Sequence, residues 1–191
     1  MNILWMDFLN SDWHDYRGSG AREDRIDQDS WLDPFLQRTA WALDRLPSPA
    51  ERGALKALRA QVRDAVERWR TGQAVPLDRI GQFNAILSQA PLVRQIDGAG
   101  GVALRPSTGD IRSVLGEVVA SLAALLAEGE PTRVKVCANP DCGWYFYDES
   151  RNQSRRWCSS RHCGNLVKVR SFRERHRRPP RDVPSRRCLD R

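Results

Sequence analysis

The residues with the most specific chemistry are four of the five cysteines, which form two pairs toward the carboxyl end of the chain. Four residues separate Cys137 from Cys142, four separate Cys158 from Cys163, and fifteen lie between the two pairs. Two tight turns can each present two sulfurs, and four thiolates bind Zn²⁺ in a closed tetrahedron. The spacing therefore predicts one structural zinc ion per chain, with these four cysteines as its ligands.

Two disulfides and uncoordinated thiols are the alternatives for these cysteines, and His162, four residues after Cys158, is the alternative fourth ligand. Residues 1–7 carry no basic group and soon turn acidic, which is not typical of a secretory signal. No apolar run reaches the roughly 18 residues of a membrane span. We therefore expect a cytoplasmic protein without a membrane partner, where a reducing environment favours metal over disulfides.

Basic side chains gather in the same part of the chain. Residues 133–191 hold 16 Lys and Arg against 6 Asp and Glu, whereas the rest of the chain holds 15 against 18. Such a basic segment predicts an anionic partner, most simply DNA, because the arginine fork bonds phosphate in two places. The side chains that we predict to bind nucleic acid are Arg151, Arg155, Arg156, Arg161, Lys168, Arg170 and Arg173. The alternative is a solvated face that balances the negative thiolates.

The same segment resembles the CGNR zinc finger. The resemblance rests on C-x4-C-G-W at residues 137–144, S-R-N-x-S-R-R-W-C at residues 150–158 and C-G-N at residues 163–165. In bacteria this finger follows an ABATE domain, whose opening motif is similar to D-F-L-N-S at residues 7–11. The resemblance implies a stress-induced transcriptional regulator. Leu166 stands where the family has arginine, so we expect weaker DNA binding than in relatives with the full motif.

The remaining pattern predicts a mainly α protein. Residues 1–131 are expected to form a helical domain with a small β-hairpin, residues 132–178 a treble-clef-like α+β zinc finger, and residues 179–191 a basic flexible tail with Cys188 as a free thiol. Apolar residues at three- and four-residue spacing predict helices over residues 31–43, 49–71, 76–90 and 111–128. Extended runs at 92–96 and 102–105 flank a glycine-containing turn and predict the hairpin.

Two details of these helices are specific enough to test. Ser48, Pro49 and Glu51 form a capping-box signature at the start of the second helix. The face of that helix opposite its apolar stripe is expected to be solvated, and it carries Arg59, Arg63, Asp64, Glu67 and Arg70. In the finger, Cys158 should precede the last helix and Cys163 should lie within its first turn, since residues five apart on a formed helix point in different directions.

Polar residues near the amino terminus are candidates for a small-molecule pocket, namely Asp7, Asn10, His14 and Arg17. The alternative is that Trp5 and Phe8 belong to the core while Asp7 and Asn10 bond nearby backbone.

Two functions are compatible with these features. One is a DNA-binding regulator whose helical domain senses a ligand or forms a homodimer. The other is a small-molecule sensor or protein-interaction module in which the finger is purely structural. An enzyme is not expected, because a four-thiolate site has no open position and no nucleophile–base pair stands out.

Overall fold

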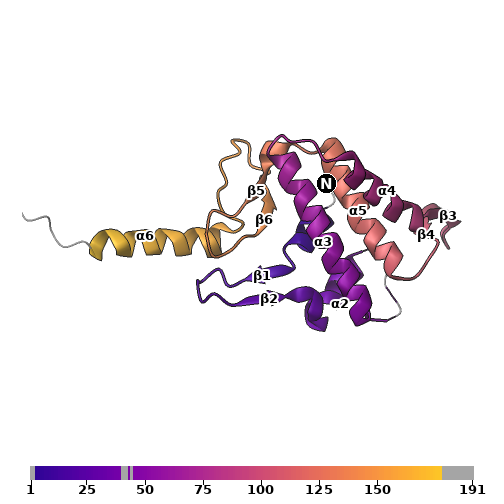
Figure 1. Ribbon diagram of the computed structural model, residues 1–191, viewed down its shortest axis with the longest axis horizontal. Helices are drawn as coiled ribbons and strands as arrows, with labels where there is room; N and C mark the ends of the chain where they lie inside the picture. The colour runs from indigo at the N-terminus through magenta and orange to yellow at the C-terminus, as the bar shows by residue number, and fades with distance from the viewer. Residues whose placement is uncertain (1–2, 40–42, 44, 178–191) are drawn as a thin grey trace, which may run out of the picture.

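The computed structural model describes residues 3–39, 43 and 45–177. The tail predicted for residues 179–191, with Cys188, lies outside them. The core lies among α1 (Leu4–Leu9), α2 (Asp29–Arg38), α3 (Pro49–Arg70) and α5 (Ile111–Glu128), and α4 (Leu77–Gln89) packs along α5 (Figure 1). Trp5 and Phe8 of α1 are fully buried among these helices. The architecture is mainly α with small β elements, as the sequence predicts. No described helix is long and apolar enough to cross a bilayer.

Three two-stranded antiparallel sheets complete the described residues. The hairpin of β3 (Leu92–Ile96) and β4 (Val102–Pro106) confirms the prediction, and it lies at the far end of the molecule from α6 (Asn165–Arg177) (Figure 1). In the finger, β5 (Val134–Val136) pairs with β6 (Tyr145–Tyr147). The hairpin of β1 (Asp12–His14) and β2 (Arg22–Asp24) was not predicted, because its strands are too short to show an alternating pattern.

Helix starts follow the local signals closely. The Ser48 hydroxyl accepts the Glu51 N–H and the Glu51 carboxylate accepts the Ser48 N–H, so the capping box at α3 is confirmed. Asp110 caps α5 by accepting from the N–H of Arg112.

The ends of helices differ more from the predictions. Helix α2 (Asp29–Arg38) ends before residue 43, since Thr39 is extended and its hydroxyl donates to the carbonyl of Leu36. On α4, Leu77 and Ile80 are exposed rather than inward. Phe83 is the buried residue of α4, which packs mainly against α5 and so leaves its first turn open. Between the longer elements lie the short helical turns η1 (Arg25–Asp27) and η2 (Pro131–Arg133).

The charged face of α3 is partly buried rather than fully solvated, which corrects the sequence prediction. Arg59 is only 8% exposed and donates two hydrogen bonds, of 2.8 and 2.5 Å, to the Asp24 carboxylate. Arg63 donates to Asp12 at 2.9 Å. Ion pairing neutralises these side chains, so a polar face can pack against the β1–β2 hairpin. Periodicity finds the apolar face of a helix, but it cannot show that the charged face has partners.

One amide joins the amino-terminal helix to the finger. Asn10, directly after α1, donates from Nδ2 to the carbonyl oxygen of Tyr145 at 3.0 Å and accepts the Tyr145 N–H at Oδ1 at 2.8 Å. All of these groups are buried. The phenol of Tyr145 donates to Glu67 of α3 at 2.6 Å, and burial together with this carboxylate raises the pKa of Tyr145. Asn10 thus bonds backbone, but in a strand 135 residues away rather than nearby.

We expect Asn10→Ala to lower the free energy of unfolding by about 2–4 kcal/mol, because it leaves two buried backbone groups of Tyr145 without partners. Urea unfolding at constant zinc concentration measures the effect. Asn152→Ala is the matched control, since Asn152 is exposed and the change should stay within about 0.5 kcal/mol. Equal stability of the two variants would contradict a stabilising role for the Asn10 amide.

Candidate metal centre and its surroundings

The first cysteine pair lies in the turn between β5 and β6. The N–H of Cys137 donates to Trp144 O at 2.8 Å, and the N–H of Cys142 donates to Asn139 O at 3.0 Å, which closes the turn. Gly143 follows with φ +68°, and a Cβ there would lie 3.5 Å from the His14 ring. Glycine is favoured at this position because it adopts positive φ without strain.

The second pair lies at the start of the last helix, as the sequence predicts. Cys158 precedes a single π-helical turn, η3 (Ser160–Gly164), that leads into α6, and Cys163 lies within this turn. The Ser159 hydroxyl accepts the His162 N–H at 3.2 Å and caps the turn. The wider turn places Cys163 beside Cys158, although the two are five residues apart.

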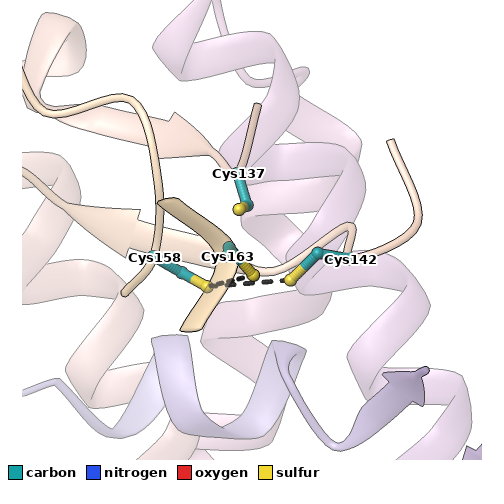
Figure 2. A group of neighbouring side chains, drawn as sticks. All are labelled: Cys137, Cys142, Cys158 and Cys163. Atoms are coloured by element: carbon teal, nitrogen blue, oxygen red, sulfur yellow. Dashed lines mark hydrogen bonds between the residues drawn. The ribbon is translucent and has the colours of Figure 1, made fainter. Parts of the chain in front are cut away.

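The four sulfurs meet at one point (Figure 2). The Sγ atoms of Cys142 and Cys158 are 3.6 Å apart, those of Cys158 and Cys163 are 3.7 Å apart, and all four lie within 4.8 Å of one another. A tetrahedron of Zn–S bonds of about 2.3 Å has edges of about 3.8 Å. A disulfide needs about 2.05 Å, so the described cysteines are not paired as disulfides. The geometry fits one structural zinc ion held by four thiolates.

The electrostatics of the cluster also fit a cation. A hydrogen bond from Cys142 lowers the pKa of Cys137, whereas the neighbouring Cys137 raises the pKa values of Cys142 and Cys158. Without a cation, one thiolate at this point therefore disfavours the others. A divalent ion offsets this repulsion and lets all four sulfurs ionise. When bound, zinc supplies a structural crosslink between the two turns.

His162 is not among the residues that could hold the ion. Its Nδ1 lies 3.0 Å from the Ser159 hydroxyl, and its ring packs edge-on against Tyr16 with centroids 6.0 Å apart. The group of sulfurs is complete without it.

A buried amide links the cluster to the amino-terminal part of the chain. Asn139 donates from Nδ2 to the carbonyl of Tyr16 at 2.8 Å, and the same nitrogen lies 3.6 Å from Cys163 Sγ. Its side chain is fully buried. The metal site and the loop between β1 and β2 therefore share one hydrogen-bond donor.

A second network holds the loop between the cysteine pairs. The buried Asp148 carboxylate accepts from Lys135 Nζ at 2.6 Å and from the Arg155 N–H at 2.9 Å. Burial alone would raise its pKa, but bonds from Lys135, Ser150 and Arg155 together hold the pKa of Asp148 well below its usual range. The loop that carries the arginines is thus fixed to β5.

The predicted nucleic-acid-binding residues divide into two groups. Arg155 donates through Nε to Trp157 O at 2.9 Å and through Nη2 to Cys158 O, so it holds the chain before the second cysteine pair. Arg170 pairs with Asp141 at 2.6 Å and donates to the carbonyl of Arg17, which fixes α6 to the first turn and to the β1–β2 loop. The other predicted side chains are exposed and make no hydrogen bond or ion pair with the described residues: Arg151, Arg156, Arg161, Lys168 and Arg173.

The four residues predicted to form a ligand pocket are not brought together. Asp7 pairs with Arg38 at 2.8 Å, and burial raises the pKa of Asp7 despite this pair. The Asn10 amide is hydrogen-bonded to the backbone of Tyr145, and Arg17 is exposed. His14 lines a cavity of about 300 Å³ between the β1–β2 region and the finger. The residues of this cavity that sequence reasoning missed are Trp13, Tyr16, Arg25 and Trp144, which no local pattern connects.

The fold and the four-cysteine cluster define a protein with a helical amino-terminal part and a zinc finger. Residues 133–176 match the CGNR zinc finger family. Residues 2–129 match the ABATE family, described as "putative stress-induced transcription regulator". The chain therefore belongs to the ABATE family. Neither description is that of an enzyme family. A search of curated proteins found no match.

We expect the purified protein to contain about one zinc ion per chain. Cys163→Ser should lose the ion and unfold the finger more than the helical part, because metal binding energy is folding energy for so small a module. His162→Ala should keep the ion. Metal analysis after mild purification measures the zinc content of the unmodified protein and of both variants. Well under half an equivalent of zinc in the unmodified protein would contradict the assignment.

Proposed function

We propose that this protein is a transcriptional regulator that binds duplex DNA through the finger. The observation that supports the proposal is the position of α6, which projects from the body of the molecule and points away from the helical core (Figure 1). The described side chains from Ser171 to His176 are exposed. A projecting basic helix suits the major groove of B-DNA, which is wide enough to admit an α-helix.

The basic side chains without a hydrogen bond or ion pair to the described residues lie on this helix and in the segment before it. Arg151 and Arg156 lie in the loop before the second cysteine pair, Arg161 lies in the π-helical turn, and Lys168 and Arg173 lie on α6. Phosphate contacts from such residues fix the orientation of a protein on DNA, while base contacts provide sequence specificity. We assign Arg155 and Arg170 a positioning role, because their guanidinium groups are already bonded within the protein.

A second candidate function is a sensor or interaction module whose finger is purely structural. It is favoured by the close attachment of the finger to the rest of the chain through Asn10, Asn139 and Arg170. Under this hypothesis the exposed arginines are solvated and DNA affinity is negligible. Under either function we also propose that the protein is cytoplasmic and forms a homodimer.

The DNA-binding proposal predicts a binding constant that falls steeply with salt, with a log–log slope of about −0.9 per phosphate neutralised. Arg173→Ala should weaken binding to all duplexes alike and reduce the slope by about one unit. Arg94→Ala is the matched control, since Arg94 is an exposed arginine on β3, at the opposite end of the molecule (Figure 1). Fluorescence anisotropy with random-sequence duplexes measures both. Affinity that is independent of salt would favour the structural role.

Leu166, in the first turn of α6, replaces the family arginine and is half-buried. If that arginine contacts phosphate, Leu166→Arg should tighten DNA binding and increase the salt slope by about one unit, with little change in stability. If it instead bonds the thiolate cluster, thermal stability and zinc retention should change while DNA affinity does not. Thermal melts and anisotropy of the same preparation distinguish the two roles. No change in either would show that position 166 tolerates both residues.

A further inference from the structure

The cavity between the finger and the β1–β2 region is walled by both parts of the chain. Trp13, His14 and Tyr16 come from β1 and the residues after it, and Arg25 comes from η1. The finger contributes Trp144, Ser159, His162 and three of the four cysteines, Cys142, Cys158 and Cys163. Its volume of about 300 Å³ is at the lower end of the range for small-molecule sites. Half of the lining residues carry aromatic rings, namely two tryptophans, one tyrosine and two histidines.

Arg25 is the strongest indication of what this cavity would accept. Its guanidinium carbon lies 5.5 Å from the ring centroid of Trp13 and 5.6 Å from that of Trp144. Partial burial lowers the pKa of Arg25, which reflects the cost of removing the cation from water. The charge of Glu23 partly offsets this shift, but among the described residues no carboxylate forms an ion pair with Arg25. A cation–π contact takes up no N–H group of the guanidinium, whose edges can bond a carboxylate in two places.

The lining and charge of the cavity further limit which class of ligand it can bind. Two indoles suit a flat aromatic ring, since stacked aromatic groups attract each other beyond the area they bury. Four thiolates around one divalent zinc ion would leave a net negative charge beside the cavity, which disfavours a ligand with several negative charges. One carboxylate beside Arg25 avoids this repulsion better than a phosphate ester does.

We propose that this cavity is a binding site for a small aromatic monocarboxylate, with the carboxylate on Arg25 and the ring beside Trp13 and Trp144. A ligand there contacts β1 and the finger at once, so its binding would stabilise their present arrangement. This site goes beyond DNA binding, and its test contains no DNA. It can therefore fail or succeed independently of the function proposed above.

Calorimetric titration of the zinc-loaded full chain tests the proposal, with benzoate and indole-3-acetate as probes and with indole-3-acetamide and phenyl phosphate as comparisons. Indole-3-acetate should bind at least about tenfold more tightly than its amide, because a charge-assisted hydrogen bond contributes that much. It should also bind more tightly than phenyl phosphate. Arg25→Gln should remove the preference for acid over amide. Arg22→Gln, an exposed arginine on the neighbouring β2 that does not line this cavity, should keep it.

A measurement on the unmodified protein keeps the test decisive if Arg25→Gln does not fold. Addition of indole-3-acetate should shift the indole N–H resonances of Trp13 and Trp144 and leave that of Trp69, on α3, unchanged. Absence of binding by both carboxylates at about 1 mM would overturn the proposal. An acid preference that survives Arg25→Gln, or shifts confined to other tryptophans, would overturn it as well.

Discussion

Four sulfurs that must share one point constrain the whole carboxyl-terminal part of this protein. The finger has little apolar core of its own: Cys137, Cys142 and Cys163 are buried with Tyr16, Trp144, Trp157 and Cys158 packed around them. Thiolates this close repel one another unless a cation lies between them. The β5–β6 turn and the π-helical turn must therefore take the positions that a tetrahedral ion requires. Because the π-helical turn leads directly into α6, the cluster also sets the direction of α6.

The cluster also determines how the finger is attached to the helical part. Asn139 bonds Tyr16 beside Cys163, and Arg170 bonds both Asp141 and the Arg17 carbonyl. On the other side of β6, Asn10 bonds both backbone groups of Tyr145. Each contact is a buried or charge-assisted hydrogen bond, the kind that costs most to break. Besides these polar contacts the two parts share apolar surface, since Val134 and Tyr145 of the finger strands belong to the apolar core that the helices form.

The cavity beside the cysteines has walls from both parts. The shared core lies at β5 and β6, and beside the cysteines the two parts leave a space that Trp13, Trp144 and Arg25 line. Arg155 and Arg170 bond within the protein, whereas the other predicted basic side chains have no such bonds among the described residues. A site that contacts both parts is suited to link ligand binding with the orientation of α6.

The sequence by itself determined the features that arise within a few residues. Cysteine spacing identified the metal ligands, Ser48 and Glu51 marked the start of α3, and the two extended runs gave the β3–β4 hairpin. The tertiary structure decided the rest. Asn10 meets Tyr145 across 135 positions, and Arg59 meets Asp24 across 35. Local periodicity carries no signal of such distant partners, because it reports only which face of an element is apolar. For that reason only the folded chain separated the arginines that bond within the described residues from those that do not, and brought Arg25 close to two tryptophans.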